Sequence, residues 1–318
     1  MILAAVYNNS LKKWHDAAWW YNSATLGNRL GLSQSFVNTY LFADGTAFTN
    51  ISGYDTLQFQ DEVKNRDKRL QQTIRMGDYK RTDGSPAPPD FTVTYSGYQI
   101  QKFSLDDKYF DARTESYNSI PIIRYAEVLL NYAEAKAELG TLTVDDWNST
   151  VEVLRTRAGV KNNGMPVDVD AYLKANFFTD ITSPMIMEIR RERGVELACE
   201  GNRYDDLRRW KAGKLLERVY DGIYVPAKGQ LLDLNGDGKY DVCFVDKVPA
   251  KKVSGVVYFQ LDNNTSKLSK GDKGNLIWLS NITKKYEDKK YEDKKYLYPI
   301  PYNEIILNPN LVQNPGWE

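Results

Sequence analysis

Apolar residues repeat at helical spacing in the middle of the chain. Between Ser119 and Gly140 they form one stripe, made by Ile122, Ala126, Leu129, Leu130, Ala133 and Ala137. This pattern predicts a helix that ends at Gly140. A second helix is predicted from Thr143, where Asp146 is placed for a capping box, and its apolar face carries Trp147, Val151, Leu154 and Ala158.

A third helix is predicted from Pro184, because Ser183 is a favourable N-cap and proline fits the first helical position. Gly201 is expected to end it, and Asn202 to open a fourth helix that reaches Trp210. The two helical pairs, about 121–158 and 184–212, look like hairpins of one stacked array. The pattern therefore favours a mainly α protein, an α-α superhelix in a single domain over residues 1–318.

Charges crowd the third and fourth helices. Glu188, Glu192, Glu196 and Glu200 recur every four residues and share one helical face, where they repel unless cations lie among them. Arg190, Arg191 and Arg193 are the expected cations. We expect a partly buried ion-pair network made by Glu188, Arg191, Glu192, Arg193, Glu196, Glu200, Arg203, Asp206 and Arg209.

Catalysis is the competing interpretation of these carboxylates, since a pair of acids performs glycoside hydrolysis. A general acid needs a raised pKa, and the nearby arginines would lower it. The structural interpretation is therefore favoured, and no catalytic residue is assigned.

The N-terminal stretch is rich in aromatic residues. Residues 1–21 fit an amphipathic helix, and Trp14, Trp19, Trp20 and Tyr21 lie within or beside its end. They are either core residues or a platform on which the face of a sugar ring could stack. Trp278 is a second candidate for such a platform.

After Lys214 the composition shifts towards Gly, Asp, Asn and Lys, so residues 215–318 are predicted to be loop-rich with a few short strands. Within this region, oxygen-bearing residues alternate as they do in a calcium loop: Asp233, Asn235, Asp237, Lys239 through its carbonyl, and Asp241. Phe244 replaces the last, bidentate acid of that pattern. A structural Ca²⁺ site is favoured over a plain Asx-rich turn.

Composition narrows the function classes. The 42 basic and 42 acidic residues give a net charge of zero, which argues against a nucleic-acid partner. His15 is the only histidine, so a His-rich zinc site is excluded. No run is long and apolar enough to span a membrane, and the start does not look like a signal peptide. The protein is therefore expected to be cytoplasmic or to lack its true N-terminus.

Four motifs, in order along the chain, resemble the SusD/RagB family of nutrient-binding outer-membrane lipoproteins. The first is Asn65-Arg-Asp-Lys-Arg-Leu70, in which Lys68 replaces a frequent proline. The second lies around Arg124 and Ala133-Glu-Ala135, the third is the charged helical hairpin that begins at Arg191-Glu-Arg193, and the fourth is the C-terminal stretch from Tyr298 to Trp317. Members of the family usually have a longer N-terminus with a lipid-bearing cysteine, which Cys199 and Cys243 do not match.

The resemblance implies a tetratricopeptide-like helical scaffold with a loop-rich second layer. It also implies a non-enzymatic, surface-exposed lipoprotein of the outer membrane that captures a glycan and delivers it to a TonB-dependent, SusC-like transporter. Two other classes stay open: a glycoside hydrolase that uses the helical carboxylates, and an intracellular helical-repeat scaffold that binds peptides.

Overall fold

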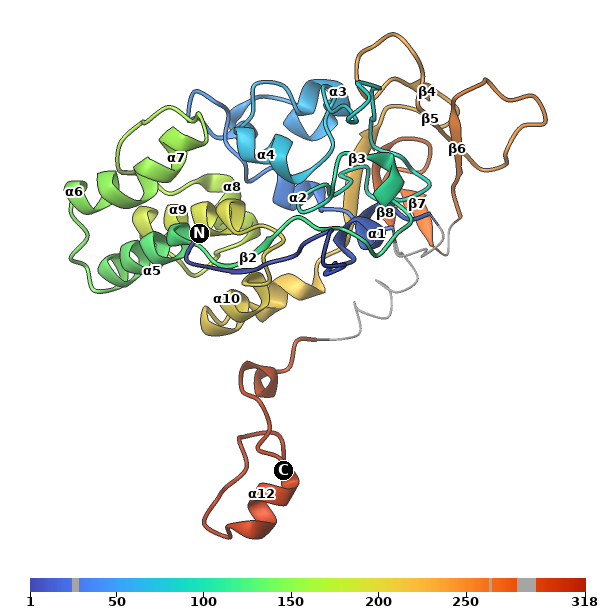
Figure 1. Ribbon diagram of the computed structural model, residues 1–318. Coiled ribbons are helices and arrows are strands. Elements are labelled where there is room, and N and C mark those ends of the chain that lie inside the picture. Colours follow the sequence, from blue (N-terminus) through green and yellow to red (C-terminus); the bar gives the residue numbers. More distant parts are fainter. Residues whose placement is uncertain (25–28, 263–264, 279–289) are drawn as a thin grey trace.

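The structure is a computed structural model, and it describes residues 1–24, 29–262, 265–278 and 290–318. Helical hairpins occupy one side of the molecule and most strands the other, while residues 29–118 run between them (Figure 1). In the described part of the chain, no helix is long and apolar enough to cross a membrane.

Two helical hairpins form the helical side. The first contains α5 (Tyr125–Glu138), α6 (Val144–Trp147) and α7 (Val153–Arg157), the last two joined by a π-helical turn, Asn148–Glu152. The second contains α9 (Pro184–Glu196) and α10 (Arg203–Arg209). Small residues of α5 and Ile189 of α9 share a buried cluster, because alanine lets the two helices approach closely.

The predicted starts at Thr143 and Pro184 are confirmed. Thr143 and Asp146 form both hydrogen bonds of a capping box, and the Ser183 side chain accepts a bond from the Ile186 N–H. Gly140, with φ of 67°, lies just past the end of α5.

Three predicted boundaries are wrong. The helix expected from Ser119 begins only at Tyr125, because Ile120–Ile123 is extended and pairs with Leu3–Ala5. The helix expected to run to Gly201 ends at Glu196, and Cys199 then adopts a left-handed φ of 61°, so Glu200 lies outside the helix. Residues 1–21 do not form one helix either. They contain a short strand, β1 (Leu3–Ala5), and only the last residues enter α1 (Ala17–Asn22). β1 is extended because it pairs with a strand far along the chain.

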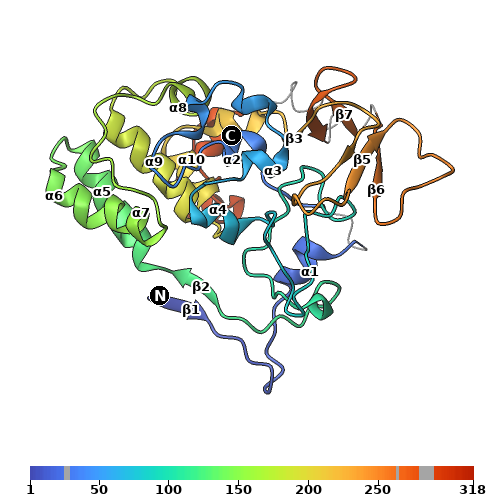
Figure 2. The ribbon, with the colours of Figure 1, turned by 90° about the horizontal axis from the view of Figure 1, so that it is seen from above.

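Within the residues that the structure describes, eight strands form three small sheets. β1 pairs antiparallel with β2 (Ile120–Ile123) at one edge of the molecule (Figure 2). The second sheet has the order β3-β8-β7 and the third β4-β5-β6, with these bounds: β3 Asp221–Val225, β4 Leu231–Leu232, β5 Val242–Val245, β6 Val257–Gln260, β7 Ser266–Leu268, β8 Gly274–Trp278. The region predicted as loop-rich thus has two three-stranded sheets, and the fold is mixed rather than mainly α.

The remaining elements are short and connect the two sides. The α-helices are α2 Gln34–Val37, α3 Phe59–Glu62, α4 Lys68–Thr73, α8 Ala171–Asn176 and α12 Tyr302–Leu307. The 3₁₀ helices are η1 Phe48–Asn50, η2 Tyr54–Thr56, η3 Lys108–Phe110, η5 Gly213–Glu217 and η6 Asp293–Tyr296.

Arg208 of α10 donates to the carbonyls of Lys295 and Tyr296, which attaches the C-terminal segment to the helical side.

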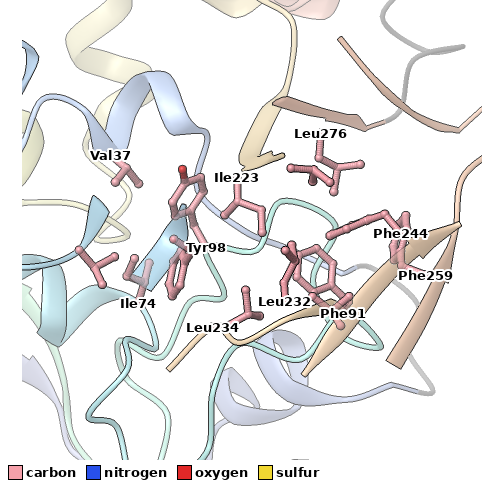
Figure 3. Packing of buried hydrophobic residues seen from close by; sticks show 14 of the residues in the cluster. Val37, Ile74, Phe91, Tyr98, Ile223, Leu232, Leu234, Phe244, Phe259 and Leu276 are labelled. Carbon is pink, nitrogen blue, oxygen red and sulfur yellow. The ribbon is translucent and has the colours of Figure 1, made fainter. Parts of the chain in front are cut away.

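The largest apolar cluster lies under the sheets rather than between the hairpins. It joins Val37, Ile74 and Tyr98 from the first third of the chain to strand residues such as Ile223 and Phe244 (Figure 3). Phe91 packs edge-on against Phe244, with ring centroids 5.0 Å apart. The members of this core come from two distant stretches of the chain, residues 37–98 and 195–276. The core therefore forms only when these stretches meet.

Buried ion pairs fasten α9 to its neighbours. Glu196 is 3% exposed and contacts Arg69 of α4 at 3.0 Å, Arg124 at 2.6 Å and Arg157 of α7 at 2.6 Å. Glu192 contacts Arg69 and also Arg155, the latter at 2.9 Å. Three elements are therefore held on one helix by two carboxylates.

The cations that pair with Glu192 and Glu196 are not those expected from the sequence. Arg190 and Arg191 pair with Glu138 and Asp170, and Arg193 pairs with Asp206 at 2.7 Å. Pairing within α9 is limited in the described structure to Arg191 with Glu188, at the longer distance of 3.5 Å. The remaining contacts are Glu188 with Arg155, Glu200 with Lys102 and Arg124, and Arg209 with Asp206 and Glu134.

We expect Glu196→Ala to destabilise the fold by about 3–5 kcal/mol, because three cations would lose a buried partner. Denaturant unfolding measures this difference. Glu138→Ala is the matched control: its side chain is 49% exposed and pairs with Arg190 at 3.3 Å, so about 0–1 kcal/mol is expected. Equal losses in both variants would contradict the role given to the network.

A second buried acid, Glu62, has a raised pKa. Glu62 is fully buried and accepts hydrogen bonds from the Tyr98 hydroxyl at 2.8 and 2.9 Å. Burial raises the pKa of Glu62 to about 7, with a contribution from Asp221, while Arg66 and the Tyr98 hydroxyl oppose the rise. The native state therefore holds this proton more tightly than the unfolded chain.

The contribution of Glu62 to stability should be complete below pH 4.5 and lost as pH rises through about 7. Glu62→Gln keeps the neutral shape and removes the titration. The stability advantage of this variant over wild type should grow by about 2.5 kcal/mol between pH 5 and pH 8. Urea unfolding at both pH values measures it, and an advantage that does not change with pH would refute the assignment.

Candidate functional site

The strand β6 lies at the edge of its sheet, at the end of the molecule farthest from α6 (Figure 2). It pairs in parallel with β5 on one side only, where Val257 N–H donates to the Asp241 carbonyl and Leu261 N–H to the Val245 carbonyl. Because backbone groups alternate along a strand, those of Tyr258 and Gln260 point to the open edge. They can donate to and accept from a polar ligand.

A depression of about 510 Å³ opens along this edge. Its lining combines aromatic, amide, hydroxyl and charged groups: Arg29, Phe91, Thr92, Tyr95, Val257, Tyr258, Phe259, Gln260, Asp262, Thr265 and Ser266. The Arg29 guanidinium lies 4.9 Å from the centre of the Tyr95 ring. Such a mixture of flat rings and hydrogen-bonding groups suits a ligand that has both C–H faces and hydroxyls.

Trp278 supports this depression from behind. It is 7% exposed, and its ring stacks on Tyr95 at 6.1 Å with only 13° between the planes. Tyr220 covers another part of the indole at 4.8 Å. Trp278 thus holds the Tyr95 ring in place, whereas the sequence suggested that it would meet the ligand itself. Tyr95 was not singled out from the sequence, where nothing distinguishes it from the other tyrosines.

Two further depressions continue along the same face. One, of about 300 Å³, is lined by Arg75, Arg81 and Asp111 among other residues, and the next, of about 460 Å³, by Lys239 and Tyr240. They share Pro86, Pro88, Asp241 and Gly255, and the first shares Val257 with the depression at Tyr95. The three hollows are therefore connected by shared lining residues, in a row that starts at β6, and could accept successive units of one extended ligand.

The N-terminal aromatic residues lie apart from this lining. Trp20 is 41% exposed, Trp14, Trp19 and Tyr21 are half-buried, and Trp19 and Trp20 meet edge to face at 5.6 Å. The indole N–H groups of Trp14 and Trp20 already donate to Asn9 and Asp16. The four residues thus offer separate faces instead of one platform, and their contact with a ligand stays a prediction.

The ion-pair network lacks the electrostatics of an acid catalyst. Burial alone would raise the pKa of Glu196, but Arg69, Arg157 and Arg124 lower it to about 2. The pKa of Glu134 is also lowered, since Arg209 and the Trp210 N–H outweigh its burial. A general acid must hold its proton near neutral pH, and these carboxylates release theirs far below it.

The calcium-like loop connects β4 to β5. Asp233 accepts hydrogen bonds from the N–H groups of Gly236 and Gly238, at 2.6 and 2.8 Å, and Gly238 has the left-handed φ of 83° that the sharp turn requires. Burial raises the pKa of Asp241 to about 6, and the charges of Asp233 and Asp237 add to the rise. A bound cation would relieve this repulsion.

The possible metal ligands of the loop do not form a complete coordination site. Among the residues that the structure describes, no three acidic, histidine or cysteine side chains converge as metal ligands. Phe244 is fully buried in the core and supplies no oxygen, so a sixth ligand would come from elsewhere. The calcium site at Asp233, Asn235, Asp237, Lys239 and Asp241 stays a prediction.

Comparison with known proteins identifies the fold. The SusD family profile matches residues 5–317. A SusD-like protein from Bacteroides fragilis superposes with a TM-score of 0.51 at 21% identity, over 90% of this chain and 47% of that one. A SusD-like carbohydrate-binding protein from the same organism gives a TM-score of 0.55 at 24% identity, over 75% of this chain and 48% of that one. No curated protein matches the chain.

The chain spans about half the length of these solved structures. Within that span the order of motifs, the two helical hairpins and the profile match over residues 5–317 agree. The chain therefore belongs to the SusD family.

Proposed function

We propose that this protein binds a glycan at the cell surface and passes it to a TonB-dependent transporter of the outer membrane. The observation that carries the proposal is the open polar face along β6, with Tyr95 stacked on Trp278 at 6.1 Å. A similar solved structure from the same family is described as a carbohydrate-binding protein.

The chemistry of the face supports a sugar ligand. A pyranose presents a C–H face that packs on an aromatic ring, and Tyr95 offers such a ring in a fixed orientation. Its hydroxyls need several donors and acceptors, which Arg29, Gln260 and Thr92 supply beside the ring. The outward backbone groups of β6 add more. An open face also lets a polymer bind by an internal segment, since neither end has to enter a closed pocket.

The proposed protein binds the glycan without hydrolysing it. Hydrolysis needs one carboxyl that keeps its proton, and the arginines around Glu196 lower the pKa of that acid to about 2. The family relationship also favours an outer-membrane lipoprotein with a tetratricopeptide-like scaffold over an intracellular peptide-binding repeat. A lipoprotein signal upstream in the gene would separate these two classes, and its absence would favour the intracellular scaffold.

We also propose that the loop from Asp233 to Asp241 holds a structural Ca²⁺. The loop borders the depression at Tyr240, so the ion would brace one end of the ligand face. The raised pKa of Asp241 supports a cation there, because three like charges otherwise crowd the turn.

For the ligand, we expect a glycan array to give a polysaccharide hit whose affinity falls roughly tenfold in Tyr95→Ala, since one stacking contact is lost. Tyr302→Ala is the matched control, because Tyr302 is 75% exposed on α12, away from this face. Isothermal titration measures each affinity.

Trp20→Ala tests the N-terminal aromatic residues in the same assay. If this variant loses binding and Tyr95→Ala keeps it, the ligand face is at the N-terminal cluster instead. New reducing ends, released by wild type and absent in Glu196→Gln, would overturn the non-enzymatic assignment.

For calcium, we expect a chelator to lower the melting temperature of the wild type, because an ion bound only to the native state stabilises it. Asp237→Ala should abolish the chelator effect. Asp205→Ala, an exposed acid on α10, should keep it. If the chelator does not change the melting temperature of well-purified protein, the calcium site is excluded.

A further inference from the structure

A separate cavity of about 370 Å³ lies on the other side of Trp278, between α2 and the second helical hairpin. Its walls are mainly apolar. Besides Trp278, they include Leu32 and Phe36 near α2, Leu197 after α9, Leu207 of α10, Leu215 and Leu216 of η5, and Val219 before β3. Leu216 and Val219 are each 41% exposed and form its rim. The cavity is therefore open to solvent through an apolar mouth.

One guanidinium in this cavity is incompletely paired. The Nη1 atom of Arg203 is buried and finds no hydrogen-bond partner in the described part of the chain. It lies against Gly194, whose missing side chain leaves the space: a Cβ there would be 3.5 Å from Nη1. A buried charged donor without a partner costs free energy, so the site favours whatever supplies an acceptor.

Neighbouring charges leave the cavity with an excess of cations. Arg193, Arg203 and Arg218 line it, together with a single carboxylate among the described residues, Asp206. Arg218 donates to the Asn176 carbonyl. Asp206 already accepts from Arg193 at 2.7 Å and from Arg209 at 2.9 Å. Burial lowers the pKa of Arg203 to about 10; Asp206 opposes this, and Arg190 and Arg193 add to it. The guanidinium nonetheless stays charged at neutral pH and lacks a full counterion.

We propose that this cavity binds a small amphipathic monocarboxylate, with its carboxylate on Arg203 and its aryl or alkyl body among the apolar walls. One vacant donor suits one anionic group. A volume of about 370 Å³ lies near the lower limit for small-molecule sites, roughly 300–1,000 Å³. A sugar fits poorly here, since its hydroxyls would face leucine and phenylalanine without partners. The site is thus distinct in chemistry from the face at Tyr95.

The test is isothermal titration of the full chain with 3-phenylpropionate, octanoate and the neutral amide 3-phenylpropanamide. We expect the carboxylates to bind and the amide to bind much more weakly. Arg203→Met should weaken carboxylate binding roughly ten- to a hundredfold, the loss expected for one charge-assisted hydrogen bond. Arg208→Met is the matched control, because Arg208 is on the same helix and bonds to Lys295 and Tyr296 instead.

Thermal unfolding without ligand gives an independent measurement. Arg203→Met removes a poorly paired buried charge, so its melting temperature should equal or exceed that of the wild type. Leu216→Trp narrows the exposed rim and should weaken binding without loss of stability. Equal binding of acid and amide, no binding of either acid, a destabilised Arg203→Met, or unchanged affinity in Leu216→Trp would each overturn the proposal.

Discussion

The buried carboxylates of α9 are the constraint on which the arrangement depends. Glu192 and Glu196 bring together arginines from α4, from the start of α5 and from α7. Each of these charges would be costly to bury alone, so the elements are stable only when they meet on α9. Such pairs add little net stability compared with apolar packing, but they leave few alternative ways to dock the hairpins. These ion pairs therefore fix how the neighbouring helical elements dock on α9.

This use of charge weighs against a catalytic role for the most acidic stretch. The same arginines that neutralise Glu196 hold its pKa at about 2. A carboxylate cannot both be fixed by three guanidinium groups and keep a proton for a leaving group. Glu62, whose burial raises its pKa to about 7, shows the other outcome, because Arg66 and the Tyr98 hydroxyl only partly offset the effect of burial. In this fold the environment, not the residue type, decides the role of each acid.

The proposed glycan face lies away from the helical hairpins, where β6 leaves an edge of its sheet open. Trp278 connects this face to the second proposed site, since it supports Tyr95 and also lines the cavity of Arg203 beside α9 and α10. The polar face along β6 suits hydroxyls, whereas the cavity suits an apolar body with one negative charge. The helical side thus borders one proposed site, and the sheets carry the other.

The sequence by itself determined the local features. Helical periodicity indicated α5, and the residues Thr143, Asp146 and Ser183 predicted the caps of α6 and α9. Ordered motifs such as Arg191-Glu-Arg193 indicated the family. These features depend on contacts within a few residues, which spacing records. Only the tertiary structure decided which arginines neutralise Glu192 and Glu196, that Leu3–Ala5 is a strand, and that Tyr95 rather than Trp278 faces the open edge. Each of these results depends on residues tens to hundreds of positions apart, because pairing partners, sheet edges and ring stacking are set by which distant segments meet, and spacing along one chain carries no record of that.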